Sequence, residues 1–394
     1  YGYVRSLWGH SAGILAALVY TYFPYHLADA YTRGAIPEHM AFIFPPLILW
    51  AYTAAFRAPS RRDALPPLLW GALAWAGLVL THNLTTLLMV LAAVPHLLLL
   101  AAWTRRWERL LPAGLSLALA MGLSAGYWLP VLLESGAMGI GAGPSRGYEN
   151  HLLAPGELFL RSLIYPYRDE QGLALVYPLS WLTPLLLLLA AALGLRRAHA
   201  GSVSHSGNVG PALAYHLGLA LVAVWMMTTL SLAIWHPLTP VLGHLQYPWR
   251  FLVLVAAGLL GAAGQVGQAL GRARTLLWAP LVALALFVLA LPGLPLKPLD
   301  LPAAQVWSPV PMWEADAAVG QVGATWTGEF LPVTVTEQRW ALGRPREGAV
   351  DGPVLQPSPQ FQLLRVGFAS LEARVESAVA LPLRLHQFAQ PGWN

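Results

Sequence analysis

The chain has 394 residues, of which 57% are hydrophobic and only 10% are charged, and its mean hydropathy is +0.55. These values exclude an ordinary soluble domain and indicate a polytopic membrane protein. The formal net charge is +5, but the basic residues are spread over short loops and form no continuous stripe, so no nucleic-acid partner is expected. The sequence contains no cysteine, which excludes both a disulfide framework and a thiolate metal site.

About nine apolar segments are candidates for membrane-spanning helices, because about 20 residues cross the roughly 30 Å of hydrocarbon. They cover residues 10–28, 39–56, 66–81, 84–103, 110–133, 174–195, 212–235, 250–270 and 275–294. The third and fourth segments are nearly continuous, and one helix of that length would be about 57 Å long, too long for a single crossing. The polar run Thr81-His82-Asn83 between them therefore predicts a hairpin tip.

The arginines of the predicted loops lie mostly on one side of this topology. Arg61 and Arg62 precede the hairpin, and Arg105 and Arg106 follow it. The positive-inside rule places these residues in the cytoplasm and the hairpin tip outside. Most carboxylates of the first 296 residues then fall on the outer face, and an odd number of spans places residues 297–394 outside as well.

Two domains are predicted. Residues 1–296 form a transmembrane helical domain, with an outer loop at 135–172 that is long enough to serve as a lid. Residues 297–394 hold half of the 18 carboxylates and alternate apolar and polar residues at 361–368, 371–376 and 381–386. This pattern predicts an incomplete extracytoplasmic domain resembling a β-sandwich. The first residue is Tyr1, and the chain stops just after a strand-like run, so we expect a fragment at both ends.

A short outer loop between the first two spans contains Asp29, Arg33 and Glu38. Ionisable groups at a membrane surface are functional candidates, because burying them there is costly. Asp29 and Glu38 could act as catalytic carboxylates, for example as a general base, while Arg33 holds a phosphate group. The alternative is a solvated loop in which one ion pair anchors the helix ends.

Two further outer residues are candidates for binding a phosphate or a lipid headgroup. His82, at the hairpin tip, could donate to a phosphate oxygen, or it could only satisfy nearby backbone groups. Arg250 begins a span on the outer side, against the charge bias of the other arginines. A guanidinium group there could bind an anionic headgroup or a pyrophosphate.

Outer aromatic residues are candidates for stacking against a sugar. Tyr127 and Trp128 lie at the outer end of the fifth span, and Tyr247 and Trp249 lie beside Arg250. An interfacial aromatic belt is the alternative explanation for Tyr247 and Trp249. No pair of outer histidines has zinc-type spacing with a carboxylate on one helix, so we predict no metal site among these residues and no cofactor. Dependence on a divalent metal stays open.

Three motifs resemble a known family. They are YTYFPYHLADAYTRG at residues 20–34 followed by Glu38, LQYPWRF at residues 245–251, and GEFLP at residues 328–332. They look like the bacterial membrane proteins labelled 6-pyruvoyl-tetrahydropterin-synthase-related, which are similar in turn to GT-C-type glycosyltransferases and to the YfhO-like family. Nothing in these residues suggests pterin chemistry.

The resemblance implies a GT-C-like helical bundle in the bacterial cytoplasmic membrane, an outer cavity and an outer β-rich domain. It also implies inverting transfer of a sugar from a polyprenyl-phosphate donor to a cell-envelope glycan or glycolipid. GT-C proteins carry key acidic residues in a long first outer loop, whereas this loop has about ten residues here. The catalytic base is therefore expected upstream of Tyr1, with Asp29 and Glu38 as second-choice carboxylates.

Two other functional classes remain open. A non-catalytic scaffold or a sugar- or lipid-binding protein would tolerate changes to every outer charge. A lipid or polysaccharide transporter would have internal repeats and ionisable residues near the middle of its spans. The sequence shows no clear repeat, and its apolar segments are almost free of charge.

Overall fold

The structure is a computed structural model, and it describes residues 1–31, 33–135, 148–158, 182–199, 209–290, 360–366 and 371–376. The chain divides into two compact units. One unit comprises residues 1–132 and 144–298, and the other comprises residues 133–143 and 299–394.

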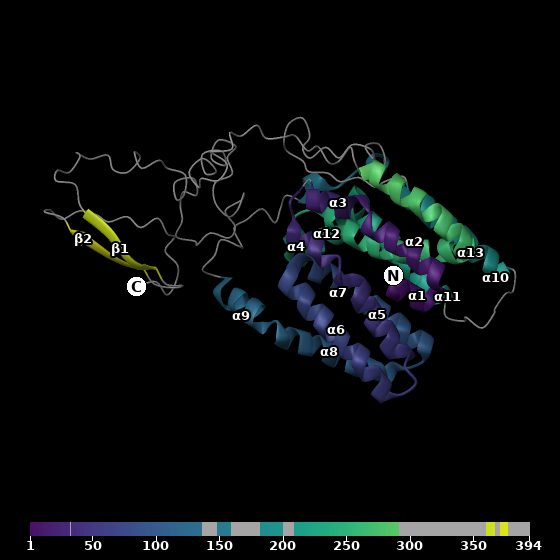
Figure 1. Cartoon of the computed structure of the whole chain (residues 1–394), viewed down its shortest axis with the longest axis horizontal. Coiled ribbons are helices and arrows are strands. Elements are labelled where there is room, and N and C mark those ends of the chain that lie inside the picture. The colour runs from purple at the N-terminus through teal and green to yellow at the C-terminus, as the bar shows by residue number, and fades with distance from the viewer. Residues whose placement is uncertain are drawn as a thin grey trace. The chain divides into compact units, whose positions relative to one another are not determined.

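The first unit is a bundle of helices (Figure 1). In chain order the helices are α1 (Gly2–Trp8), α2 (His10–Thr21), α3 (Pro24–Tyr31), α4 (Ile36–Ala41), α5 (Phe44–Arg57), α6 (Arg61–Thr81), α7 (Asn83–Thr104), α8 (Leu110–Leu123), α9 (Ala125–Glu134), α10 (Leu182–His199), α11 (Val209–Met226), α12 (Leu232–Leu242) and α13 (Leu252–Ala290). Short 3-10 helices lie between them: η1 (Trp107–Arg109), η4 (Tyr148–His151), η5 (Pro155–Leu158), η6 (Thr229–Ser231), η7 (Gly243–Leu245) and η8 (Pro248–Phe251).

Four described helical segments are long and apolar enough to cross a membrane: Ile36–Arg57, Arg61–Thr81, Asn83–Thr104 and Pro248–Ala285. A bent pair, Trp107–Leu123 with Ala125–Glu134, is a fifth candidate if its two helices form one span. Three apolar helices are shorter: His10–Thr21, Thr183–Arg196 and Gly210–Met226. The prediction of a membrane protein with several apolar helices is therefore confirmed, whereas the described residues do not show nine spans.

Two predicted spans are broken in the structure. The segment 10–28 ends as a helix at Thr21 and restarts as α3 at Pro24, because proline lacks an N–H group and disfavours a helical conformation in the residue before it. The segment 110–133 bends by 72° around Ser124. There Trp128 Nε1 donates to the carbonyl oxygen of Met121 at 2.8 Å, which satisfies an acceptor near the end of α8.

The first half of α13 is the centre of the bundle. Every residue from 251 to 267 is buried, and a helix that is apolar on all sides is stable only when other helices surround it. The helix packs against α2, α10 and α11. Gly271, with φ 72° and ψ 175°, breaks α13 where the sequence predicts the boundary between the last two spans.

Four glycines at three-residue spacing, Gly258, Gly261, Gly264 and Gly267, allow this close packing. A Cβ atom on Gly258 would lie 2.7 Å from the carbonyl oxygen of His216 in α11. A Cβ atom on Gly267 would lie 2.9 Å from Cα of Ala12 in α2. The glycines therefore follow a ridge along which the backbones of α11 and α2 approach α13.

Arg106, which the sequence predicts to be cytoplasmic, and the nearby Arg109 cap a helix. Arg109 is buried, and its guanidinium group donates to the carbonyl oxygens of Ala55 and Ala58, the latter at 2.8 Å. Arg106 donates to the same Ala58 oxygen. Because the last carbonyl groups of a helix lack intrahelical partners, these contacts stabilise the end of α5. These arginines therefore also have a structural role, which the positive-inside rule does not describe.

In the second unit the structure describes a β-hairpin. Strand β1 (Gln360–Val366) pairs antiparallel with β2 (Leu371–Glu376), and the register shifts between Leu363 and Arg365. Two of the three predicted strand segments thus form this hairpin, while 381–386 lies outside the described residues. The β-sandwich and the domain boundary at residue 296 stay predictions.

The glycine ridge gives a test of the packing around α13. Gly258→Ala should lower the thermal stability of the detergent-solubilised protein, because forcing a methyl group into a packed core costs about 1–3 kcal/mol. Gly218→Ala, in α11, is the control, because nothing lies within 4 Å of its Cβ position. It should be neutral or stabilising by up to about 1 kcal/mol. Equal melting temperatures for the two variants would contradict the proposed packing.

Candidate functional site

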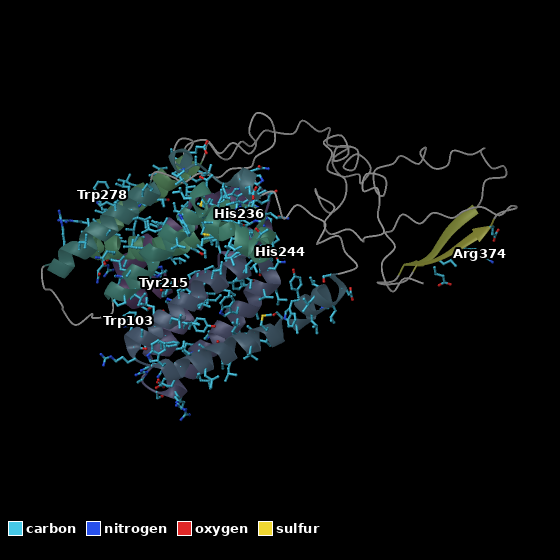
Figure 2. All side chains as sticks on the ribbon, turned by 180° about the vertical axis from the view of Figure 1, so that it is seen from behind. Trp103, Tyr215, His236, His244, Trp278 and Arg374 are labelled. Carbon is cyan, nitrogen blue, oxygen red and sulfur yellow. The ribbon has the colours of Figure 1, made fainter. Side chains whose placement is uncertain are left out.

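The candidate site is a group of four ionisable residues, Asp29, Arg33, Glu38 and Arg250, which we call the charged cluster. Asp29 lies in α3, Glu38 in α4 and Arg250 in η8, and Arg33 lies in the turn between α3 and α4. Figure 1 shows α3, α4 and α12 close together in the helical unit. Figure 2 places His236 of α12 and His244 of η7 well away from Trp103, near the other end of that unit.

The turn between α3 and α4 brings the acidic residues together. The Ala35 amide donates to the carbonyl oxygen of Asp29 at 2.8 Å, which folds the chain back on itself. Gly34 has φ 62°, a left-handed conformation that glycine adopts without strain. Proline at the beginning of α4 then starts the helix that carries Glu38.

One nitrogen of Arg33 serves three acceptors. Its Nη1 donates to Asp29 Oδ1, to Glu38 Oε2 at 2.9 Å and to the Tyr25 hydroxyl at 2.9 Å. Tyr25 in turn donates to Glu38 Oε1 at 2.6 Å. Arg250 Nε lies 3.7 Å from Glu38 Oε2. Glu38 is therefore the acceptor that connects both arginines.

The cluster is almost dry. The side chain of Asp29 is 0% exposed and that of Glu38 is 2% exposed, while Arg33 and Arg250 retain 12% and 10%. A carboxylate buried to this extent is stable only with a close cation and hydrogen-bond donors. The ion pair that the sequence analysis considered is therefore present, but it lies in a buried network and not in a solvated loop.

The two carboxyl groups have different surroundings. Within the described part of the chain, Asp29 Oδ2 has no hydrogen-bond partner, whereas Glu38 has partners on both oxygens. Burial, and then the charge of Glu38, raise the pKa of Asp29 well above its usual range, and the nearby Arg33 only partly opposes this.

A strained turn holds Arg250. Gln246 has φ 61° and ψ −43°, and the Tyr247 amide donates to the carbonyl oxygen of Leu245 at 2.6 Å. This is the rarer type of γ-turn, with positive φ in a residue that is not glycine. The same Leu245 oxygen accepts a hydrogen bond from Arg250 Nη1 at 2.8 Å. The turn therefore orients the guanidinium group toward Glu38.

Tyr247 and Trp249 contact the charged cluster. Their rings stack with centroids 4.8 Å apart, and the guanidinium group of Arg33 lies 4.4 Å from the Trp249 centroid. The guanidinium group of Arg250 lies 5.3 Å from the Tyr247 centroid. Because Trp249 is only 2% exposed, its role in the described structure is cation-π support of Arg33. Sugar stacking on these rings stays a prediction.

His82 is the N-cap of α7, as the backbone-capping alternative predicts. Its Nδ1 accepts the Thr85 amide at 3.3 Å, which leaves the ring proton on Nε2. Burial lowers the pKa of His82 to about 4, the charge of Glu38 opposes this shift, and the two arginines add to it. His82 is therefore neutral at pH 7, and toward a phosphate it could act only as a neutral donor.

Tyr127 and Trp128 lie elsewhere, in α9. Trp128 binds the Met121 carbonyl at the bend described above, and Tyr127 is 42% exposed. Neither ring is among the aromatic groups that stack at the charged cluster. Their predicted role in sugar binding stays a prediction.

Part of the predicted 135–172 loop is described, and this segment, residues 148–158, packs on the bundle. Tyr148 stacks on Trp235 of α12 with centroids 4.7 Å apart, and Leu153 exchanges backbone hydrogen bonds with Met227 and Thr229. His151 contacts the Tyr247 ring edge-on at 4.8 Å. The segment thus reaches the aromatic residues of the site. Whether the loop acts as a lid stays a prediction.

Sequence reasoning missed two residues of this site. Tyr25 lies four residues before Asp29, a helical spacing that could have linked them. His151 had no local signal, because only the packing of a distant loop brings it here. Among the described residues no group of three or more His, Asp or Glu side chains could hold a metal ion.

These features define a polytopic helical membrane protein with a buried ionic cluster. The chain belongs to the 6-pyruvoyl-tetrahydropterin synthase related domain family, a membrane-protein family whose model matches residues 1–293. No curated protein and no solved structure matches the chain. The predicted resemblance to this family is confirmed, whereas the wider resemblance to GT-C glycosyltransferases and YfhO-like proteins stays a prediction.

The hydroxyl group of Tyr25 tests how tightly the cluster is built. Tyr25→Phe removes both the donor to Glu38 and an acceptor for Arg33, so thermal stability in detergent should fall by about 1–3 kcal/mol. Tyr31→Phe, in the same helix, is the matched control because Tyr31 is 60% exposed. It should change stability by less than about 0.5 kcal/mol. If Tyr25→Phe is as stable as the control, the two hydrogen bonds of the Tyr25 hydroxyl contribute nothing to stability.

Proposed function

We propose that this protein is a membrane glycosyltransferase of the GT-C type, which transfers a sugar from a polyprenyl-phosphate donor to an extracytoplasmic glycan or glycolipid. The observation that carries the proposal is the buried charged cluster, in which two arginines from distant segments share Glu38. Guanidinium groups fixed in this way suit a phosphate group that must be neutralised at the edge of a membrane.

In the proposed reaction, an acceptor hydroxyl oxygen attacks the anomeric carbon of the sugar. The bond from that carbon to the phosphate oxygen breaks, and the phosphate leaves with the electron pair. Arg33 and Arg250 would stabilise the negative charge that develops on this leaving group. A carboxylate takes the hydroxyl proton, and Asp29 and Glu38 are the candidates within the described residues.

The surroundings of the cluster fit a lipid-linked donor. The helices next to it are apolar enough to border a membrane, so a polyprenyl chain could lie along them while its phosphate reaches the arginines. Tyr247 and the docked segment 148–158 would then border the sugar and the acceptor. The proposal includes the nine-span topology, with the cluster and the C-terminal residues on the extracytoplasmic side of the bacterial cytoplasmic membrane.

One observation favours a second candidate, a non-catalytic scaffold or lipid-binding protein. Both oxygens of Glu38 already have partners within the protein. The same arrangement is expected of a purely structural ion-pair network that joins helix ends, which we call an ionic clasp. The two candidates differ in their consequences. A clasp predicts loss of stability when an arginine is replaced, whereas a transferase predicts loss of transfer in protein that remains folded.

Replacing Arg250 tests the proposal. The full chain in lipid nanodiscs would be incubated with polyprenyl-phosphoryl sugars carrying a radiolabelled glucose, mannose or arabinose, together with membrane glycolipid acceptors. Arg250→Lys keeps the positive charge but loses the planar fork of donors, so transfer should fall by about tenfold or more while the protein remains folded. Arg62→Gln is the control, because Arg62 is exposed in the first turn of α6.

The outcomes separate the candidates. Wild-type transfer that Arg250→Lys reduces and Arg62→Gln leaves unchanged supports the transferase. Binding of polyprenyl phosphate without transfer of any of these sugars supports the lipid-binding protein and contradicts the transferase. If neither transfer nor binding is found, and Arg250→Lys only lowers the melting temperature, the cluster is a structural clasp.

A further inference from the structure

In the charged cluster, the carboxyl group of Glu38 accepts hydrogen bonds from more donors than that of Asp29. Arg33 Nη1 carries two protons, but three acceptors surround it: Asp29 Oδ1, Glu38 Oε2 and the Tyr25 hydroxyl. The hydroxyl proton of Tyr25 goes to Glu38 at 2.6 Å. In this arrangement Asp29 receives only a share of one donor nitrogen, whereas Glu38 accepts from both Tyr25 and Arg33.

Asp29 is the residue that lacks donors. It is 0% exposed, its Oδ1 shares one nitrogen with two other acceptors, and its Oδ2 has no partner among the described residues. Glu38 accepts from Tyr25 and Arg33, and Arg250 Nε lies 3.7 Å away. An anionic oxygen without a donor in a dry site is far more costly than a neutral acid, so a proton is more stable on Asp29.

We infer that Asp29 carries a proton in the resting protein, which gives the charged cluster a net charge of +1 and makes it selective for a singly charged phosphodiester over a diphosphate. The charge follows from two guanidinium groups and one carboxylate, Glu38. His82, which faces the cluster from the corner between α6 and α7, is neutral, and so is Tyr25. This inference rests on the proposed function for the identity of its ligand.

The two carboxyl groups then have different roles. A neutral Asp29 cannot act as the general base, so Glu38 is the ionised carboxylate of the pair. Asp29 instead sets the charge of the site, as a specificity-determining residue. A dry cluster with one uncompensated positive charge favours a ligand that supplies one negative charge, as the phosphodiester of a polyprenyl-phosphoryl sugar does.

The pH dependence of binding follows with a definite sign. As the pH rises through the raised pKa of Asp29, the residue loses its proton and the cluster goes from +1 to 0. The affinity for a phosphodiester, whose own charge is constant over this range, should therefore fall as the pH rises. Asp29→Asn keeps the shape of the neutral acid and cannot ionise, so its affinity should not depend on pH through this group.

The experiment uses the full chain in nanodiscs and two probes, polyprenyl-phosphoryl glucose and polyprenyl-diphosphoryl glucose. Below the pKa of Asp29, Asp29→Asn should bind the phosphodiester within about threefold of wild type. Glu38→Gln should weaken its preference over the diphosphate by about tenfold, because the variant removes the negative charge of the cluster. A loss of affinity of tenfold or more in Asp29→Asn, or a pH dependence that persists in that variant, would overturn the inference.

Infrared spectroscopy of the same samples tests the proton without any ligand. The wild type should show the carbonyl band of a protonated buried carboxylic acid, and Asp29→Asn should lack it. If this band is present and neither probe binds, the proposed function fails while the proton on Asp29 stands. If Asp29→Asn does not fold, a wild-type spectrum that contains no such band at any pH below 8 overturns the inference on its own.

Discussion

A charge removed from water needs an oppositely charged group nearby, and in this protein Glu38 is the carboxylate that both arginines approach. One arginine, Arg33, follows α3, and the other, Arg250, lies in η8 directly before α13. The three segments can meet only if the turn after α3 folds back and the γ-turn at Gln246 orients Arg250. The geometry of the whole region therefore depends on one buried carboxylate.

The central helix gives this cluster a rigid base. Arg250 lies in η8, directly before α13, and all residues from 251 to 267 are buried. The glycine ridge allows α2 and α11 to pack closely against that helix. Packed interiors resist deformation, so the buried residues that follow Arg250 fix its backbone. The hydrogen bond to the Leu245 carbonyl oxygen fixes its guanidinium group. In the proposed reaction, a guanidinium group fixed in this way would need little reorganisation to bind the phosphate.

Aromatic residues connect the cluster to the docked segment, residues 148–158. Trp249 supports Arg33, Tyr247 stacks on Trp249, and His151 of the docked segment contacts Tyr247. The segment and Arg33 are therefore linked by the contacts of two rings, Tyr247 and Trp249. The membrane-interface explanation for Tyr247 and Trp249 does not account for these contacts, since Trp249 is buried within the protein.

The sequence by itself determined the class of protein, because apolar composition and segment length are properties of each segment alone. It also identified all four residues of the charged cluster, since ionisable residues stand out in an apolar chain. The hydropathy of the segments did not reveal the breaks at Tyr22 and Ser124, although Pro24 in the sequence accounts for the first of them. Only the tertiary structure decided that Asp29, Arg33 and Glu38 are buried with Arg250, that His82 caps a helix, and that Trp249 supports Arg33. These outcomes depend on contacts between segments far apart in the chain, and no local pattern records them.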